Sequence, residues 1–256
     1  MITCKAISTG GLGRFGNNCF SIAGTIGIAV KNNQPFGFDP WRTVDNALFG
    51  QPIDNMADYF VNTLPQLPEG LSFQDIPYHW EYREYNIPDG NWNICSHLQD
   101  QRYFEHCMPL IRHYFRMKDE PEQNDFVAIH YRAGDYINDP AAYHPRCSKD
   151  YYEHAVRHFP PETIFFMFTD AKYSELKSVF PMEIFDQTSI HSKSYLEDFR
   201  MMKRCKSFIT ANSSFSLFAA ILGEHPEKKI ICPRRWFGEA AGGMRFEGYP
   251  KEAIVL

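Results

Sequence analysis

The feature that most constrains the fold is an alternation of short apolar runs with helix-like segments after residue 125. The apolar runs expected to be strands are residues 126–129, 164–168, 207–211 and 230–232. The segments expected to be helices are residues 150–159, 174–180, 195–205 and 215–222. This alternation predicts a parallel sheet with helices on both faces. Ligands of such sheets bind just past the carboxyl ends of the strands.

The first part of the chain has a weaker pattern. Residues 2–7 form a candidate strand, and a glycine-rich run at 8–16 separates it from a candidate helix. Either Asn17 or Asn18 is placed to cap that helix. A second helix is expected over residues 96–117, where apolar residues recur at helical spacing.

A polar stretch at residues 118–125 is the best domain boundary in the chain. It divides the sequence into two predicted domains, residues 1–122 and 123–256. Before the boundary, residues 35–96 are rich in proline and aromatic residues and have only weak periodicity. A length of 256 residues is compatible with two compact domains.

Composition excludes several classes of function. With 26 basic and 31 acidic residues, the net charge of −5 argues against a protein that coats nucleic acid. No apolar run reaches the roughly 18 residues that a membrane helix needs, so no transmembrane segment is expected. The seven cysteines are an odd number without a Cys-x-x-Cys pair. They indicate reduced thiols and a cytoplasmic protein without a zinc site.

A glycine-rich motif follows the first predicted strand. The sequence Gly-Leu-Gly-Arg-Phe-Gly at 11–16 fits the pattern Gly-x-Gly-x-x-Gly. Its glycines permit close backbone approach, and the next helix offers unpaired N–H groups to an anion. Asp39, 23 residues beyond Gly16, is compatible with dinucleotide binding. An ordinary turn and another kind of phosphate or sugar loop remain open, and Arg14 favours the last.

A second motif follows the predicted strand 126–129. Alternation along the strand places His130 and Arg132 on the same side, and Gly134 permits a sharp exit from the sheet. Arginine binds phosphate oxygens in a bidentate manner and keeps its charge near neutral pH. The alternative interpretation is a structural ion pair between Arg132 and Asp135.

Polar residues also follow two further predicted strands. Asn212, Ser213 and Ser214 precede a helix that begins near Phe215, where they can cap the helix or hold a phosphate. Asp170 follows the strand 164–168 and can meet a ribose or base edge, or begin a turn.

Taken in order, these motifs resemble those of a known family. The run His130-x-Arg132-x-Gly134-Asp135-Tyr136 resembles the signature of the α-1,2-fucosyltransferases, which are related to α-1,6- and protein O-fucosyltransferases. Further stretches similar to family motifs lie at 10–13, 98–104, 144–152, 168–170 and 202–216. The loop Gly-Arg-Phe-Gly-Asn at 13–17 resembles that of the protein O-fucosyltransferases. The chain departs from the family at Ala171 and at Leu217-Phe218, which replace a common Asp and a Trp-Trp pair.

The resemblance implies an α/β fold of GT-B type, with two Rossmann-like halves, parallel sheets and an active-site cleft between them. Residues 1–122 would be the acceptor-side half and residues 123–256 the half that binds the GDP-sugar donor. The implied reaction transfers L-fucose from GDP-fucose to a hydroxyl of an oligosaccharide or glycoconjugate, α-1,2 to galactose, with inversion. It needs no metal and no cofactor besides the donor substrate.

The resemblance also implies roles for residues of the predicted donor site. Arg132 neutralises the leaving β-phosphate, and the hydroxyls of Ser213 and Ser214 hold other phosphate oxygens. His130 orients the donor or Arg132, and Asp170 contacts the nucleoside. The complete set of expected donor-binding residues is His130, Arg132, Asp170, Asn212, Ser213, Ser214, Phe215, Gly11, Gly13 and Arg14.

The expected catalytic residues are Arg132, Asp135 and Asn17. An inverting displacement normally needs a general base on the acceptor hydroxyl, and Asp135 and Asp39 are the candidates. The aromatic residues of 36–96 are expected to face the acceptor, although core packing is the alternative for each. These are Trp41, Tyr78, Trp80, Tyr82, Tyr85 and Trp92.

Two other functions remain alternatives. An NAD(P)-dependent oxidoreductase would use the loop 11–16 and Asp39, but would leave Arg132 and Asn212 unexplained. A catalytically inactive GDP-sugar-binding relative would bind the donor without turning it over.

Overall fold

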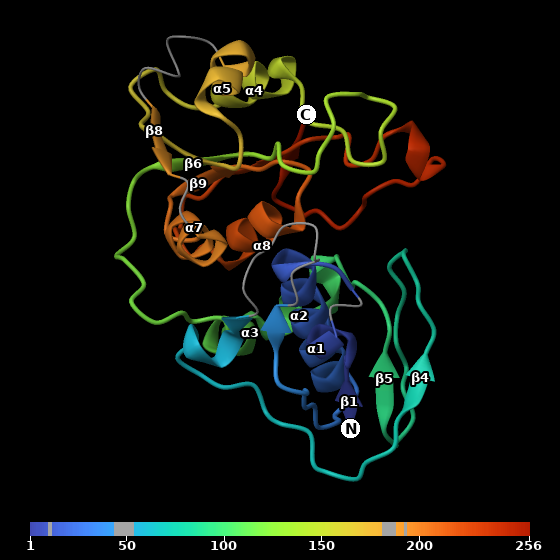
Figure 1. Ribbon diagram of the computed structural model, residues 1–256. Helices are drawn as coiled ribbons and strands as arrows, with labels where there is room; N and C mark the ends of the chain where they lie inside the picture. The colour runs from blue at the N-terminus through green and yellow to red at the C-terminus, as the bar shows by residue number, and fades with distance from the viewer. Residues whose placement is uncertain (10–11, 44–53, 181–187, 192–193) are drawn as a thin grey trace. The chain divides into compact units, whose positions relative to one another are not determined.

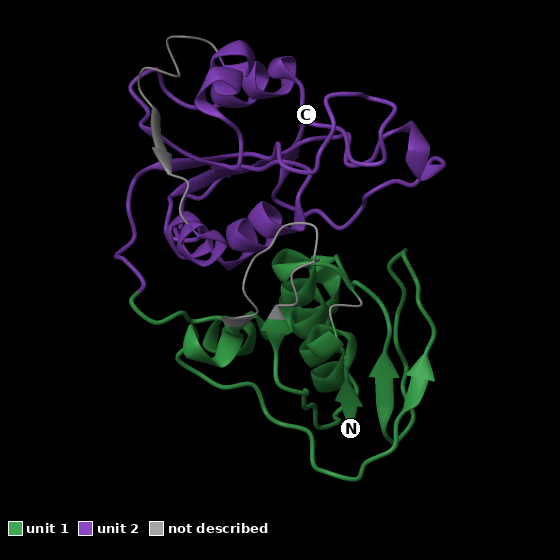
Figure 2. Ribbon diagram, viewed as in Figure 1, with its two compact units in different colours: residues 1–119 green, residues 120–256 purple. Residues whose placement is uncertain are grey.

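The computed structural model describes every residue except 10–11, 44–53, 181–187 and 192–193 (Figure 1). The chain divides into two compact units, unit 1 with residues 1–119 and unit 2 with residues 120–256 (Figure 2). Each unit contains its own parallel sheet.

Unit 2 contains a six-stranded sheet in which all neighbouring strands are parallel. In chain order the strands are β6 (Val127–Tyr131), β7 (Phe165–Thr169), β8 (Thr188–His191), β9 (Ser207–Ile209), β10 (Ile230–Cys232) and β11 (Ile254–Val255). Across the sheet they lie in the order β11-β10-β9-β6-β7-β8. This is the order of dinucleotide-binding folds, in which the topology switches between the first and fourth strands. The place expected for a ligand is therefore at the carboxyl ends of β6 and β9.

Helices cover both faces of this sheet (Figure 1). α4 (Lys149–Val156) and α5 (Tyr173–Val179) lie on one face, and α7 (Tyr195–Met202) and α8 (Ser214–Leu222) lie on the other. Val127, Ile129 and Tyr131 of β6 belong to the core that includes residues of α4 and α5. Because side chains alternate along a strand, His130 points to the α8 face. Its ring centroid lies 5.6 Å from that of Phe215.

The structure confirms the expected α/β class with parallel sheets. All four strands predicted for unit 2 are present, and β6 runs to Tyr131, so that His130 lies within the strand. β8 and β11 were not predicted, because both are edge strands that are short or rich in polar residues. The helices predicted over 150–159 and 195–205 end three residues early, at Val156 and Met202, where i→i+3 turns replace the helix.

Unit 1 contains a three-stranded parallel sheet in the order β1-β5-β4. Its strands are β1 (Ile2–Thr3), β4 (Gln74–Ile76) and β5 (Trp92–Ile94), and an antiparallel pair joins β2 (Arg42–Thr43) to β3 (Asp54–Asn55). Its α-helices are α1 (Ala6–Thr9), α2 (Phe15–Lys31) and α3 (Met108–Tyr114), and its 3-10 helices are η1 (Met56–Asp58), η2 (Gln101–Tyr103) and η3 (Glu105–Cys107).

Two predictions about the start of unit 1 are wrong. The strand predicted over residues 2–7 ends at Thr3, and the Lys5 amide donates to the Asn93 side chain, 2.9 Å away, before α1 begins. Neither Asn17 nor Asn18 caps α2, because the helix begins two residues earlier than Asn17. Arg14 occupies the cap position with extended backbone and makes no side-chain capping bond.

The single helix predicted over residues 96–117 is also wrong. In its place the chain forms η2, η3 and α3. Leu98 has a φ of 50° and Phe104 has a φ of −137°, both incompatible with a continuous α-helix. This irregular segment packs closely on α2, where an added Cβ at Gly27 would lie 2.1 Å from the Tyr103 carbonyl oxygen. Close packing against α2 therefore replaces helical regularity here.

The aromatic residues of unit 1 are divided between core and surface. Trp41 is buried, with its ring centroid 5.5 Å from that of Phe15 and 5.3 Å from that of Phe60. Tyr85 is also buried, whereas Tyr78 is 48% exposed. Burial rules out the expected acceptor-facing role for Trp41 and Tyr85.

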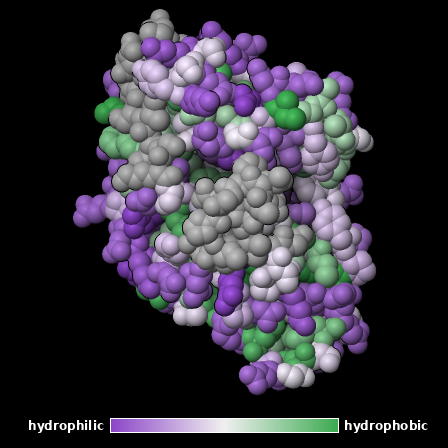
Figure 3. Space-filling model, viewed as in Figure 1, coloured by the Kyte–Doolittle hydropathy of each residue, from purple (hydrophilic) through white to green (hydrophobic). Residues whose placement is uncertain are grey.

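The visible face in Figure 3 is mostly hydrophilic, and its apolar residues form small separate patches. The large apolar side chains found exposed among the described residues are Val30, Val61, Leu71, Tyr78, Ile137, Tyr143, Ile164 and Tyr173. None of the helices described is both long enough and apolar enough to span a bilayer.

Candidate active site

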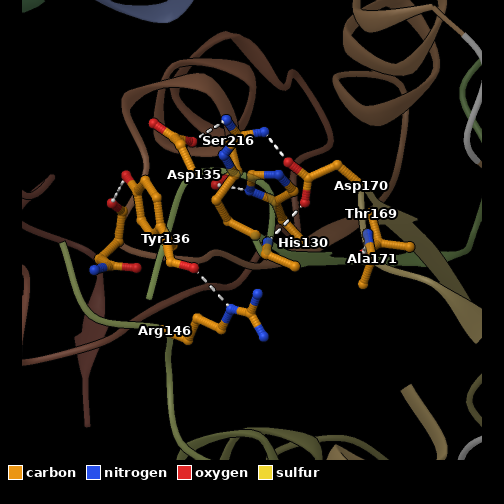
Figure 4. Close-up of polar contacts among 11 residues, drawn as sticks. His130, Asp135, Tyr136, Arg146, Thr169, Asp170, Ala171 and Ser216 are labelled. Carbon is orange, nitrogen blue, oxygen red and sulfur yellow. Dashed lines mark hydrogen bonds and ion pairs between the residues drawn. The ribbon is translucent and has the colours of Figure 1, made fainter. Parts of the chain in front are cut away.

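At the carboxyl end of β6, Arg132 lies between the carboxylates of Asp135 and Asp170, two residues labelled in Figure 4. Arg132 Nη1 donates to Asp170 Oδ2, and Nη2 donates to Asp135 Oδ1. The Arg132 side chain is 20% exposed and each carboxylate 32% exposed. Because these groups are partly withdrawn from water, their attraction is less screened than that of a surface pair. The ion pair between Arg132 and Asp135 foreseen from the sequence is present, and Asp170 adds a second one.

Strand order explains how Asp170 reaches Arg132. It follows β7, the neighbour of β6, and its Oδ1 accepts the amide of Ala133 at 2.7 Å. Asp170 is thus held by the backbone as well as by the guanidinium. Gly134 is required beside it, since a Cβ at that position would lie 2.4 Å from Asp170 Oδ2. The expected contact of Asp170 with a nucleoside stays a prediction, and the structure adds its contact with Arg132.

His130 connects β6 to α8 beneath this cluster. Its Nδ1 lies 2.8 Å from the Ser216 hydroxyl oxygen, and the side chain is buried (Figure 4). Burial, and secondarily the charge of Arg132, lowers the pKa of His130 to about 3 against the opposing effect of Asp170. The imidazole is therefore neutral at physiological pH and suits a positioning role better than proton transfer.

The turn between β9 and α8 contains the expected phosphate-binding residues. Ser213 is the N-cap residue of α8, yet its hydroxyl does not cap the helix. Ser214 and Phe215 begin the helix and are partly exposed. A nine-residue helix that starts at the end of a parallel strand directs the N–H groups of its first turn toward the carboxyl edge of the sheet.

Asn212 occupies a different place from the one expected. Its side chain is 1% exposed, and its amide nitrogen donates to the carbonyls of Pro145 and Trp236, at 2.8 and 2.9 Å. The Cys147 thiol donates to its Oδ1 at 3.4 Å. These bonds fix the turn that leads into α8. Asn212 is therefore a structural support of the site, and its donor-binding role stays a prediction.

The motif at 144–152 supports the same strand ends from α4. Ser148 caps this helix by accepting the Tyr151 amide at 3.2 Å. The Tyr152 hydroxyl donates to the His130 carbonyl at 2.8 Å, and the Tyr151 hydroxyl lies 2.7 Å from the Thr210 carbonyl oxygen. The sequence indicated a family-like stretch at 144–152 and a helix over 150–159, but not these contacts with the strands. The two adjacent tyrosines after the cap were the signal that it also holds β6 and β9.

Unit 1 contains the remaining expected site residues. Gly13 has a φ of +84°, and an added Cβ there would lie 2.4 Å from the Asn17 amide nitrogen. Asn17 Oδ1 accepts a hydrogen bond of 2.6 Å from the Gln99 side chain. Arg14, between Gly13 and Asn17 in the sequence, is the N-cap residue of α2. Gly11 lies outside the described residues. Gly13, Arg14 and Asn17 therefore form one loop cluster in unit 1.

A cavity of about 500 Å³ lies at the opposite, amino-terminal edge of the sheet in unit 2. Lys206 on its wall pairs with Asp125 and Glu227. Its position at the amino ends of β6 and β9 separates it from the residues described above. Within the described part of the chain, no three His, Cys, Asp or Glu side chains gather in a way that would hold a metal ion.

Fold and site together define an α/β protein with a Rossmann-like sheet and a charged site at its topological switch point. The chain belongs to glycosyl transferase family 11, whose model matches residues 71–236. This confirms the expected class of glycosyltransferase and decides against the oxidoreductase alternative.

Two relatives from Escherichia coli are similar in sequence. The O-antigen biosynthesis glycosyltransferase WbnK is 30% identical over 122 residues, which are 45% of this chain and 40% of WbnK. An alpha-1,2-colitosyltransferase is 28% identical over 167 residues, which are 58% of this chain and 57% of that protein. The chain thus spans about half the length of these relatives.

Solved structures of NodZ share the fold. The fucosyltransferase NodZ from Bradyrhizobium matches with a TM-score of 0.52 and 16% identity, over 86% of this chain and 92% of that chain. NodZ alpha-1,6-fucosyltransferase soaked with GDP-fucose matches with a TM-score of 0.50 and 16% identity, over 87% and 91% of the two chains. This likeness confirms the expected α/β architecture of GT-B type.

Proposed function

We propose that the chain transfers L-fucose from GDP-fucose to a hydroxyl group of a glycan, α-1,2 to galactose, with inversion and without a metal. The observation that carries this proposal is that Arg132 and the N-terminus of α8 both lie at the switch point of the sheet in a family 11 chain. Both groups favour a diphosphate there. The NodZ structure soaked with GDP-fucose supports the choice of donor by likeness of fold.

Arg132 must exchange a carboxylate for a phosphate when it binds the donor. Asp170 is held by the Ala133 amide, and so it stays with Nη1 of the guanidinium. Nη2, which donates to Asp135, becomes the contact for the β-phosphate. Charge that develops on the departing GDP then lies beside a cation fixed in a partly buried site, which stabilises the transition state. Asp135 is released at the same moment.

The α8 side of the site provides the second contact with the diphosphate. The Ser213 and Ser214 hydroxyls and the N–H groups at Phe215 donate to phosphate oxygens not held by Arg132. Neutral His130 keeps α8 in register with β6 through its contact with Ser216. Because His130 carries no charge, it adds no competing cation near Arg132.

Asp135, once displaced, is the candidate general base for the acceptor hydroxyl. The loop cluster of Gly13, Arg14 and Asn17 is proposed to bind fucose and the acceptor, as the acceptor-side role of residues 1–122 requires. Tyr78, which is 48% exposed, is the most exposed aromatic residue among those described in 36–96, and so it is the candidate for stacking on a sugar. Its hydroxyl lies 3.1 Å from His97 Nδ1, which fixes the ring.

A donor and acceptor screen tests this function. Release of the nucleoside diphosphate is measured, as GDP from GDP-fucose and GDP-mannose and as UDP from UDP-galactose, with and without EDTA. Products from galactose-terminated acceptors are analysed by NMR. We expect GDP release from GDP-fucose that EDTA does not slow, and an α-1,2 product of inverted anomeric configuration. Absence of GDP release with every acceptor would instead favour the inactive GDP-sugar-binding alternative.

Because one relative is an alpha-1,2-colitosyltransferase, colitose is a second candidate for the sugar that this chain transfers. Nucleotide-linked colitose is therefore included in the donor screen. A kcat/KM for this donor that exceeds the value for GDP-fucose would reassign the sugar while leaving the role of Arg132 unchanged.

A further inference from the structure

We propose that Tyr136 is a positioning residue that holds Arg132 and the Ser213–Ser214 turn at one fixed spacing for the diphosphate. This inference rests on the proposed function, because it concerns the geometry of the same site. Tyr136 itself is not assigned to contact the donor.

The Tyr136 ring lies next to the guanidinium of Arg132. Arg132 Cζ is 5.6 Å from the ring centroid, within the range of a cation–π contact. The ring is in turn stacked on His144, with ring centroids 5.2 Å apart and an angle of 11° between the ring planes. Arg132 therefore has a nonionic neighbour that remains in place when a carboxylate is exchanged for phosphate.

The Tyr136 hydroxyl reaches the other half of the site. It donates to the Asn212 carbonyl at 2.9 Å, directly before the Ser213–Ser214 turn (Figure 4). One side chain thus spans from the loop after β6 to the loop after β9, the two strands that border the switch point. The distance between the arginine and the helix start depends on this bridge.

The backbone of Tyr136 is itself anchored, as a positioning residue requires. Its amide donates to the Ala133 carbonyl at 2.8 Å, and its carbonyl accepts Arg146 Nε at 2.9 Å. Arg146 forms an ion pair with Glu175 of α5. The ring, the hydroxyl and the backbone are therefore held by three different parts of unit 2.

Calorimetric titration with GDP of Tyr136→Phe and Tyr136→Leu, each with Arg132 intact and with Arg132→Ala, tests the proposal. Tyr136→Phe removes only the hydroxyl bridge and should weaken GDP binding about two- to tenfold, as expected for one hydrogen bond. Tyr136→Leu also removes the ring and should weaken it by about a further two- to fivefold. With Arg132→Ala in place, the difference between Tyr136→Phe and Tyr136→Leu should vanish.

Tyr143→Phe is the matched control. Tyr143 is 44% exposed in the same loop after β6, and its hydroxyl contacts the Met244 sulfur. This variant should bind GDP as the wild-type protein does. A purely structural role of Tyr136 would lower the thermal midpoint of both Tyr136 variants. The difference in GDP affinity between Tyr136→Phe and Tyr136→Leu would then not depend on Arg132.

The outcomes separate this inference from the function on which it rests. Wild-type protein that binds no GDP would overturn the proposed function. Wild-type binding combined with unchanged affinity in Tyr136→Phe would overturn the positioning role alone, and this arm decides even if Tyr136→Leu does not fold. A difference between Tyr136→Phe and Tyr136→Leu that persists with Arg132→Ala would also overturn it.

Discussion

The loop after β6 and the loop directly before α2 each contain an arginine and a glycine, but their side chains are held in different ways. At Gly134 and at Gly13, an added Cβ would lie 2.4 Å from a neighbouring side chain. After β6, two carboxylates already hold Arg132. Before α2, Arg14 occupies the helix cap position beside an Asn17–Gln99 amide pair. The first arrangement suits an ionic ligand that replaces a carboxylate, and the second suits the neutral hydroxyls of a sugar.

The largest expected effect comes from removing the side chain of Arg132. Arg132→Ala should lower kcat/KM for GDP-fucose hydrolysis by about 10²–10³, the scale on which loss of an oxyanion donor slows catalysis. Arg132→Lys should recover only part of this, because the two-pronged guanidinium is lost. Steady-state GDP release measures both values.

Arg14→Ala is the matched control in the other loop. It should leave donor hydrolysis within a few-fold of the wild-type rate and should reduce transfer to the acceptor more strongly. Equal losses of donor hydrolysis in Arg14→Ala and Arg132→Ala would erase the distinction between the two loops.

Gly134→Ala should have the next largest effect. The added methyl group meets Asp170 Oδ2 at 2.4 Å and Arg132 Cζ at 3.3 Å, so the ion pair must shift. A misplacement of about 1 Å in a catalytic group can reduce the rate by up to about 100-fold. The expected result is a lower kcat for GDP release with a thermal midpoint near that of the wild type. Unchanged kcat would show that the Asp170–Arg132 pair is not part of the working geometry.

Asn17→Ala should have a moderate effect confined to the acceptor. The change removes the amide that Gln99 contacts at 2.6 Å, and one such hydrogen bond is worth about 1 kcal/mol. We expect KM for the acceptor to rise about fivefold while GDP affinity stays constant, as measured by initial-rate kinetics and calorimetry. Gln99→Ala should reproduce the change if the pair acts as a unit, whereas a loss of GDP affinity would contradict the assignment.

A further prediction concerns the pH dependence of stability instead of the reaction rate. Burial places the folded-state pKa of His130 at about 3, below the ordinary value of 6.5. Between these values the unfolded chain binds the proton and the folded chain does not, so this group makes stability rise with pH up to about 6.5. The slope contributed is at most about 1.4 kcal/mol per pH unit. Urea unfolding at pH 5 and 7.5 should show that the free energy of unfolding depends less on pH in His130→Asn than in the wild type. An equal pH dependence in the two proteins would contradict the lowered pKa of His130.

The sequence predicted the residues at the ends of β6 and β9 because each follows an apolar run that is long enough to be a buried strand. His130, Arg132 and Ser213 could be placed at the edge of a sheet from that pattern alone. The ion pair of Arg132 with Asp170 was not predictable in this way, because it depends on β7 lying beside β6. Strand order is a tertiary property that a local pattern does not contain.

Asn212 and Trp41 show the same limit for side-chain roles. The sequence places Asn212 next to a helix start, where exposure and burial are equally compatible with its polarity, and the structure buries it. Trp41 lies in a segment with only weak periodicity, so nothing local indicated that it packs between Phe15 and Phe60. In the proline-rich part of unit 1, contacts between segments distant in sequence determine which side chains are buried, and the local sequence pattern does not show them.

The central claim is that the switch point of unit 2 binds the diphosphate of the donor through Arg132. Calorimetric titration of wild-type protein, Arg132→Ala and Arg14→Ala with GDP tests it most directly. We expect the wild type and Arg14→Ala to bind GDP with similar affinity, and Arg132→Ala to bind it at least about tenfold more weakly, as loss of a charge-assisted contact requires. Equal affinity of Arg132→Ala and the wild type would contradict it.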